Sequence, residues 1–264
     1  MIIALISAVP AAEQEPDTDW YDTQQNTFTI NSAGQLAGLA KLVNESAADF
    51  NGKTISLAND ISLFGTWAPW TPIGTDAKPF KGTFDGGGNK ITDLLISNPQ
   101  DFDFGCCGLF GHVAGGTVKN LVVEGEVEGE ANVGGIVGLF NNGSIINCSF
   151  KGTVKSWGAT AGGVAGWLSF GSSAENCFFE GVVSGSSSHI GGVVGLLADA
   201  RTAPDELIAG KDNSVTNCYS TDSKISGNAV LGGVAGYVYG GSVTSCYSTG
   251  AEISNGHTAG GVVG

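Results

Sequence analysis

Basic residues are scarce in this sequence. Its 264 residues include 11 Lys and Arg against 25 Asp and Glu, which gives a formal net charge of −14. A surface of this charge repels the phosphates of nucleic acids and the headgroups of an anionic membrane. We therefore expect neither a nucleic acid nor a membrane surface as a main partner, and only a loose attraction of cations.

Long apolar runs are also lacking. The sequence has no segment long enough to cross a bilayer, so we expect no membrane insertion. A short apolar run, residues 2–9, precedes Pro10 and an acidic stretch that starts at Glu13. This order is typical of the end of a secretory signal, so residues 1–12 are predicted to be a signal-peptide remnant. The alternative is a disordered or wrongly assigned N-terminus.

The short motifs of several enzyme classes are missing. We find no Gly-x-Ser-x-Gly, no phosphate-binding loop with Lys and no His-Glu-x-x-His, and His112, His189 and His257 all flank glycine-rich phrases. Asp101 and Asp103 could lie about 7 Å apart on one side of a strand, as in glycosidases, but any exposed Asp-x-Asp has this geometry. The sequence therefore predicts no catalytic residue, no metal site and no cofactor.

Glycine, by contrast, is abundant, with 43 residues and no three-residue collagen period. Many of these glycines belong to one phrase: two glycines, two apolar residues and a third glycine. It begins at Gly134, Gly162, Gly191, Gly232 and Gly260, with a variant copy at Cys107. The first residues are 27, 28, 29, 41 and 28 positions apart. A repeat of about 28 residues is the sequence signature of a solenoid.

Each unit contains three short strands separated by Gly, Asn and Ser. One apolar column falls inside the glycine phrase: Leu109, Ile136, Val164, Val193 and Val234. Another column marks a bend, because Asn tolerates left-handed dihedral angles: Asn120, Asn147, Asn176, Asn217 and Ser245. Such units predict an all-β, right-handed parallel β-helix in which equivalent residues stack about 4.8 Å apart. A helical solenoid is disfavoured, since no stretch within the units holds a 3.6-residue period.

Four of the six cysteines follow the repeat. Cys148, Cys177, Cys218 and Cys246 come directly after the bend column, so we expect them to form a ladder. Their parallel Cα–Cβ directions suit disulfides poorly, and a line of sulfur atoms cannot surround a tetrahedral zinc ion. The ladder is therefore predicted to consist of buried thiols that pack as small apolar side chains. The oxidation state of the neighbouring pair, 106–107, stays open.

Residues 13–106 are predicted to form an N-terminal cap and irregular first coils. Ser32 and Gln35 have the spacing of a capping box, and an apolar stripe at helical spacing runs from Leu36 to Val43. We expect a short α-helix that ends at about residue 45. Because the open end of a β-helix exposes unpaired backbone groups, this helix is predicted to cover that end.

The repeats proper are assigned to residues 107–264. The spacing of 41 contains about 12 extra residues, which are predicted to form an extruded loop at about 198–211. The sequence stops inside a glycine phrase with no predicted cap. We therefore expect the repeats to be truncated here and the natural protein to continue.

These units resemble a known family. Gly134–Gly138 followed by Gly143–Cys148 is similar to the GLUG motif, and the segments Gln35–Ala40, Trp70–Gly74 and Phe84–Gly88 are similar to the leader that typically precedes such repeats. The resemblance covers about residues 28–264. It implies a β-helix of a bacterial secreted or surface protein, as in adhesins and the non-catalytic region of IgA-specific metallopeptidases. It implies no catalytic activity, because the motif itself is not catalytic.

Aromatic residues at outward positions are the candidate ligand-binding residues. One column contains His112, Leu139, Trp167, Leu196 and Tyr237, and another contains Phe178, Tyr219 and Tyr247. Trp67 and Trp70 lie in a proline-containing loop before the repeats. Trp67, Trp70, Trp167, Tyr219, Tyr237 and Tyr247 are therefore predicted to contact a glycan or an extended peptide. The alternative is that they pack beneath loops or against neighbouring coils, with the two indoles over the capped end.

Two classes of function follow. The first is a non-catalytic structural or adhesion module of a secreted or cell-surface protein, whose partner is a glycan or a host surface protein. The second is enzymatic: the module is the stalk of a larger secreted peptidase, or a polysaccharide-active β-helix. A polysaccharide-active β-helix needs several carboxylates on one outer face, whereas Asp and Glu here scatter among the columns. The oligomeric state does not follow from the sequence.

Overall fold

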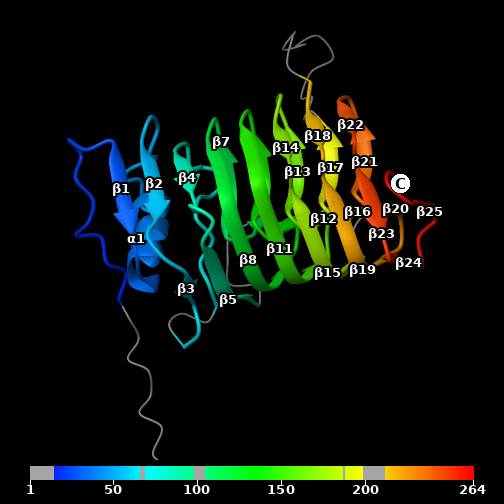
Figure 1. Ribbon diagram of the computed structural model, residues 1–264, viewed down its shortest axis with the longest axis horizontal. Helices are drawn as coiled ribbons and strands as arrows, with labels where there is room; N and C mark the ends of the chain where they lie inside the picture. Colours follow the sequence, from blue (N-terminus) through cyan, green and yellow to red (C-terminus); the bar gives the residue numbers. More distant parts are fainter. Residues whose placement is uncertain (1–14, 66–68, 98–104, 187, 199–211) are drawn as a thin grey trace, which may run out of the picture.

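The structure is a computed structural model that describes residues 15–65, 69–97, 105–186, 188–198 and 212–264. In these ranges the chain forms a parallel β-solenoid with one α-helix near its N-terminus (Figure 1), which confirms the predicted all-β fold. The predicted signal remnant, most of the predicted extruded loop, the Asp101 and Asp103 pair and Trp67 lie outside the described residues. The division into an N-terminal region and repeats stays a prediction.

Three parallel sheets run along the axis of the solenoid in the described ranges. Sheet A contains β1 (Thr27–Ile30), β2 (Thr54–Leu57), β3 (Ile61–Ser62), β4 (Thr83–Asp85), β5 (Lys90–Ile96), β8 (Thr117–Gly129), β11 (Ser144–Ser156), β14 (Ser173–Glu175), β15 (Phe178–Gly185), β18 (Ser214–Thr216), β19 (Tyr219–Ser226), β22 (Ser242–Thr244), β23 (Tyr247–Thr249) and β24 (Glu252–Ser254). Sheet B contains β7 (Phe110–Ala114), β10 (Val137–Asn141), β13 (Ala165–Ser169), β17 (Val194–Ala198) and β21 (Ala235–Tyr239). Sheet C contains β6 (Cys106–Cys107), β9 (Asn132–Gly134), β12 (Thr160–Gly162), β16 (His189–Gly191), β20 (Val230–Gly232) and β25 (Thr258–Gly260).

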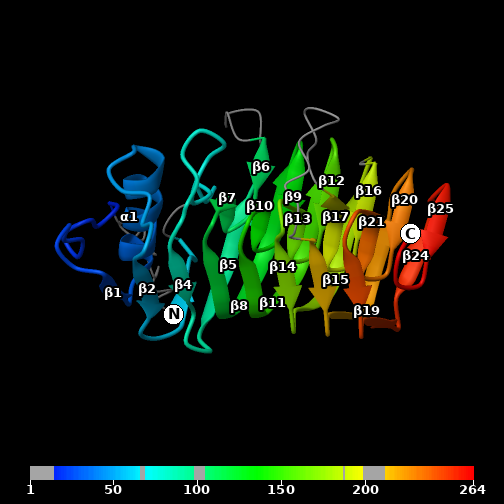
Figure 2. The same ribbon diagram turned by 90° about the horizontal axis from the view of Figure 1, so that it is seen from above.

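Successive coils stack with equivalent residues in register. Val137 of β10 pairs with Ala165 of β13, and Val154 of β11 pairs with Val183 of β15. The apolar column of the glycine phrase points inward as predicted, and each of its members is fully buried: Leu109, Ile136, Val164, Val193 and Val234. Figure 2 shows the resulting rows of strands along the axis, with α1 at the N-terminal end. The core is therefore one column of side chains that extends from coil to coil.

The glycine phrase is required by close backbone approach. A Cβ atom on Gly166 would lie 2.6 Å from the carbonyl oxygen of Gly138 and 2.7 Å from the amide nitrogen of Val133. A Cβ atom on Gly163 would lie 2.2 Å from the Phe179 ring, which reaches it from sheet A. Neither glycine has a positive φ. The strands of sheets B and C thus pack directly on each other, and only a residue without a side chain fits between them.

The bend column behaves as predicted. Asn120, Asn147, Asn176, Asn217 and Ser245 all have φ between 53° and 54°. The Asn147 amide donates to Asn120 Oδ1 at 3.0 Å, and the Asn176 amide donates to Asn147 Oδ1 at 3.1 Å. The left-handed dihedral angle is therefore combined with a ladder of side-chain hydrogen bonds that joins the coils.

This column provides a first prediction. Asn147→Val places a β-branched residue at φ 54° and removes both ladder bonds, so the free energy of unfolding should fall by about 2 kcal/mol. Asn147→Gly keeps the dihedral angle accessible and should lower it by less than about 1 kcal/mol. Urea unfolding followed by circular dichroism measures both. Equal losses would show that the dihedral angle contributes nothing.

Helix α1 (Ala33–Asn44) begins at the predicted cap and follows the first strand of the first coil. Ser32 Oγ accepts from the Gln35 amide at 3.2 Å, while Gln35 Oε1 accepts from the Asn31 amide at 2.9 Å instead of the Ser32 amide. β1 precedes the helix and pairs with β2, so the first coil starts at Thr27 and α1 lies within it. Strand β1 was not predicted from the sequence, because it has only four residues and follows an acidic segment.

Candidate ligand-binding surface

A row of aromatic rings lies on the outer side of sheet A. Phe178, Tyr219 and Tyr247 are aligned by the pairing of β15, β19 and β23. Their ring centroids are 4.9 Å apart at both steps, with interplanar angles of 31° and 5°. The predicted column is therefore confirmed as a continuous stack, which we call the tyrosine row.

The stacking decides which parts of these rings a ligand can reach. Phe178 and Tyr219 are half-buried because each neighbouring ring covers a face, whereas Tyr247 is 51% exposed. The Lys151 ammonium also lies 5.6 Å from the centroid of the Phe178 ring. A ligand therefore meets ring edges and phenolic hydroxyls, and one free ring face at Tyr247.

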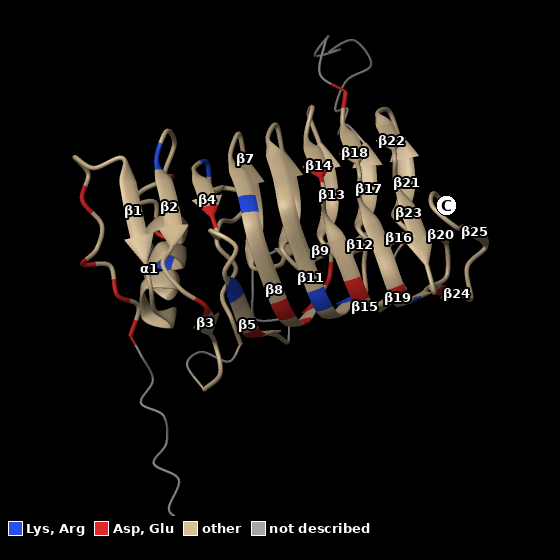
Figure 3. Ribbon diagram, viewed as in Figure 1, with Lys and Arg blue, Asp and Glu red and all other residues tan. Residues whose placement is uncertain are grey.

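Hydroxyl side chains surround the tyrosine row. Thr216 and Thr244 lie on its one side, with their Oγ1 atoms 3.1 Å apart, and Thr221 pairs with Thr249 on the other. Charged side chains of β5, β8, β11 and β15 on the same sheet pair across neighbouring strands (Figure 3). These ion pairs are Lys90–Glu124, Lys155–Glu128 and Lys151–Glu180, at 3.5, 3.4 and 2.9 Å. The charged part of sheet A therefore reaches Phe178, the first ring of the tyrosine row, whereas Tyr219 and Tyr247 lie among Thr and Ser residues.

The other predicted aromatic column is mostly covered. His112 is 7% exposed, and Trp167 is half-buried with its indole N–H donating to the Ala198 carbonyl at 2.7 Å. Tyr237 is 37% exposed, and its ring stacks on His189 with centroids 4.8 Å apart. The prediction that this column lies outside was wrong for His112 and wrong in part for Trp167. Outward parity along a strand does not reveal which other segments cover the strand.

His112 illustrates this cover. Its Nδ1 lies 3.7 Å from Asp76 Oδ1, and its Nε2 lies 3.0 Å from the Asn141 side-chain amide. Burial lowers the pKa of His112, and the Asp76 carboxylate opposes this shift. In the part of the chain that the structure describes, no three His, Cys, Asp or Glu side chains come together as a metal site.

Trp70 does not form a surface platform. It is 1% exposed, its backbone N–H donates to Leu95 at 2.7 Å and its indole N–H donates to the Leu109 carbonyl at 3.2 Å. The prediction that Trp70 stacks on a ligand at the surface is therefore wrong, because its indole is buried against neighbouring coils.

The cysteine ladder is present. Cys148, Cys177 and Cys218 are buried free thiols, and the Cys177 amide donates to Cys218 Sγ at 3.3 Å. Burial raises the pKa of Cys148 to about 12, and hydrogen bonding to Cys177 raises that of Cys218 to about 12. Cys106 and Cys107 are also free and buried, with pKa values raised by burial to about 12 and about 11.

The raised pKa values predict slow thiol chemistry. At about pH 8 roughly one Cys148 in ten thousand is a thiolate, so Ellman's reagent should label the folded ladder over hours or longer. Cys246 is only partly buried and is the most accessible of the ladder thiols, but its hydrogen bond with Cys218 raises its pKa, so it should also react slowly. All six thiols should react at once in denaturant. Rapid labelling of Cys148 in the folded protein would contradict the buried ladder.

The fold and its glycine phrases define a parallel β-solenoid repeat protein. Residues 129–155 and 227–254 match the family model of the GLUG motif, so these two segments carry that motif. No helix in the described ranges has the length and apolar character to span a membrane.

Other proteins share the fold or part of the sequence. One solved structure, "Crystal structure of a putative immunoglobulin A1 protease from Bacteroides ovatus", is similar with a TM-score of 0.57 and 19% identity, over 90% of this chain and 84% of the other. A second, "IgA1 Protease", has a TM-score of 0.53 and 20% identity, over 91% of this chain and 21% of the other. A "Putative Gly-rich membrane protein" of Evansella cellulosilytica is 30% identical over 159 residues, which are 57% of this chain but 17% of that protein. The structural likeness concerns the fold alone.

Proposed function

We propose that this chain is a non-catalytic structural and adhesion module of a bacterial secreted or cell-surface protein. The observation that carries the proposal is the continuous path of paired parallel strands through sheet A. The path β1-β2-β4-β8-β11-β14-β18-β22 begins with a hydroxyl residue in every strand: Thr27, Thr54, Thr83, Thr117, Ser144, Ser173, Ser214 and Ser242. Bending such a stack requires breaking backbone hydrogen bonds between coils, so the solenoid is a stiff spacer.

The tyrosine row is the contact surface in this proposal. It combines exposed ring edges with threonine hydroxyls, and the ion pairs beside it, Lys151–Glu180 and Lys224–Glu252, each compensate their own charge. A neutral hydrogen-bonding surface with aromatic edges suits a glycan or a polar host protein. Location outside the cell rests on the GLUG motif and on the relative that is described as a membrane protein.

The adhesion role is tested by binding of the intact chain to a glycan array and to immobilised host surface proteins. Tyr247→Ala should weaken binding about tenfold or more, because it removes the most exposed ring of the row. Tyr239→Ala is the matched control, since Tyr239 is 57% exposed but belongs to β21 of sheet B. An equal loss of binding in the two variants would show that the tyrosine row is not the contact surface.

A second candidate is an enzymatic context: the module as the stalk of a larger secreted peptidase, or as a polysaccharide-active β-helix. The fold likeness to the two IgA1 protease structures favours the stalk. The intact chain should leave immunoglobulin A1 and acidic or neutral polysaccharides unchanged, as measured by gel electrophoresis and by the release of reducing ends. Cleavage of any of these by the purified chain would overturn the non-catalytic assignment.

A further inference from the structure

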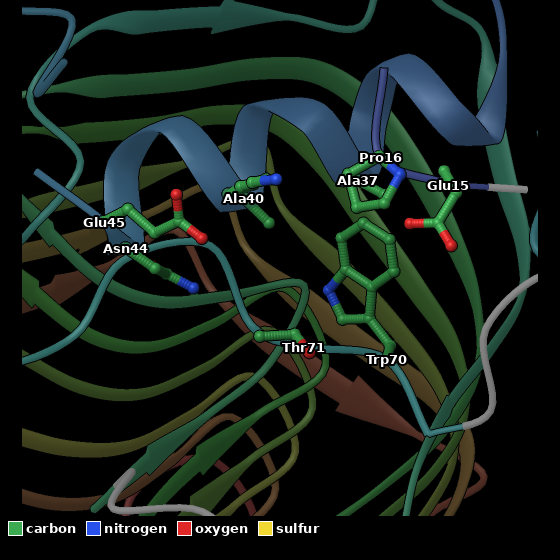
Figure 4. Close-up of a pocket in the computed structure, with 9 residues that line it drawn as sticks. Glu15, Pro16, Ala37, Ala40, Asn44, Glu45, Trp70 and Thr71 are labelled. Atoms are coloured by element: carbon green, nitrogen blue, oxygen red, sulfur yellow. The ribbon is translucent and has the colours of Figure 1, made fainter. Parts of the chain in front are cut away.

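A pocket of about 380 Å³ lies beside α1, at the end of the solenoid away from the tyrosine row (Figure 4). Its walls come from three segments: the chain before β1, one face of α1 and the loop after β3. The lining residues are Glu15, Pro16, Ala37, Ala40, Lys41, Asn44, Glu45, Trp70 and Thr71. This volume lies in the range of small-molecule sites.

The pocket is held open by the fold itself. Ala37 and Ala40 leave space on the helix face, because larger side chains at these positions would fill it. Asn44 holds the opposite wall, since its amide donates to the Pro72 carbonyl at 2.9 Å and its Oδ1 accepts from the Gly74 amide at 2.8 Å. Trp70 is held in the pocket wall by its hydrogen bonds to the carbonyls of Leu95 and Leu109. A ligand therefore meets a site that is largely formed in advance.

The charged groups of the pocket lie at its two ends. Figure 4 shows Glu45 at one end and Glu15 at the other, next to Ala37 and Pro16, and Lys41 lies one helical turn before Glu45. Helix geometry places Glu45 about 12 Å from Ala37 along the axis. Within the described residues, none of these three charged groups forms an ion pair or a side-chain hydrogen bond. Apart from the polar residues Asn44 and Thr71, the rest of the lining is apolar.

We propose that this pocket binds a basic α-amino acid. Glu45 accepts from the α-ammonium group, and Lys41 donates to the α-carboxylate. The aliphatic stem of the ligand lies against Ala37, Ala40 and Pro16, and Glu15 pairs with the cation at its far end. This arrangement gives each charged group of the pocket an opposite partner.

Calorimetric titration of the intact chain tests the proposal with three probes. L-lysine carries all the groups that the pocket is proposed to bind. L-norleucine lacks the terminal cation, and cadaverine lacks the carboxylate. We expect saturable binding of L-lysine at one site, and binding at least tenfold weaker for each of the other two. No saturable binding of L-lysine, or equal binding of cadaverine, would overturn the assignment.

Two variants locate the interaction. Glu15→Gln should weaken L-lysine binding about tenfold without changing that of L-norleucine, and Lys41→Gln should weaken both amino acids but not cadaverine. Glu175→Gln is the matched control, because it removes one exposed carboxylate from sheet A, far from the pocket. If Glu15→Gln and Glu175→Gln have the same effect, the attraction is that of an acidic protein for any cation and the site is refuted. Glu15, Lys41 and Glu175 are all exposed, so these substitutions should leave the fold unchanged. Circular dichroism verifies that each variant is folded.

Discussion

Gly163→Ala is expected to lower the free energy of unfolding by about 3 kcal/mol or more, or to prevent folding. A Cβ atom there would lie 2.2 Å from the Gly192 carbonyl oxygen and 2.2 Å from the Phe179 ring. The first neighbour is backbone of the next coil, which cannot move without disturbing the register of sheets B and C. The φ of Gly163 is not positive, so the loss would come from space alone. Urea unfolding followed by circular dichroism measures it.

The repeat offers a control at the same place in the motif. Gly261 is the second glycine of another copy of the phrase, and a Cβ atom there would have no neighbour within 4 Å. Gly261→Ala should therefore change the free energy of unfolding by less than about 0.5 kcal/mol. Equal losses of stability in the two variants would mean that backbone dihedral angles require the glycines of the phrase. The packing of sheets B and C on each other would then not be the cause.

Phe179→Ala is expected to lower the free energy of unfolding by about 3–5 kcal/mol. The Phe179 ring is fully buried, stacks on Phe150 with centroids 6.4 Å apart at 4°, and lies against Gly163. No side chain from the glycine phrase can expand into the space that the ring leaves, because the phrase presents a glycine there. The cavity would therefore persist and would remove contacts from two coils at once.

The neighbouring residue provides the comparison. Phe178 precedes Phe179 on β15 but lies half-buried on the outer side, in the tyrosine row. Phe178→Ala should lower the free energy of unfolding by about 1 kcal/mol, because it loses one stacked neighbour and little burial. Chemical unfolding of both variants, with unchanged m-values, measures the difference. Similar losses would mean that β15 does not separate a core side from an outer side.

Much of the fold was predictable because the repeat makes each position visible several times. The inward column from Leu109 to Val234, the bend at Asn147 and the thiol ladder follow from spacing alone. A period-2 strand pattern tells which side a residue faces, and a 28-residue repeat tells which residues stack. These are local or strictly periodic properties, so the structure confirmed them.

The candidate site was predictable only in part. Tyr219 and Tyr247 lie on the surface as expected, but Trp70 is buried and Trp167 is partly covered. Their surroundings come from segments distant in sequence: Leu109 for Trp70 and Ala198 for Trp167. The pocket beside α1 gave no sequence signal, since its walls come from three separate segments and its shape depends on how the loop at Trp70 docks on the helix.

The sequence by itself determined that the chain is a stack of coils, because the same residues recur at one period and stacked strands bury them together. It also determined which columns point inward. The tertiary structure alone decided that sheets B and C touch through their glycines, that the aromatic rings of sheet A cover one another, and that α1 lies within the first coil and lines a pocket. The contacts of α1 and of the pocket join segments that no period relates, and the approach of the glycines and the overlap of the rings depend on distances between coils that the sequence pattern does not give.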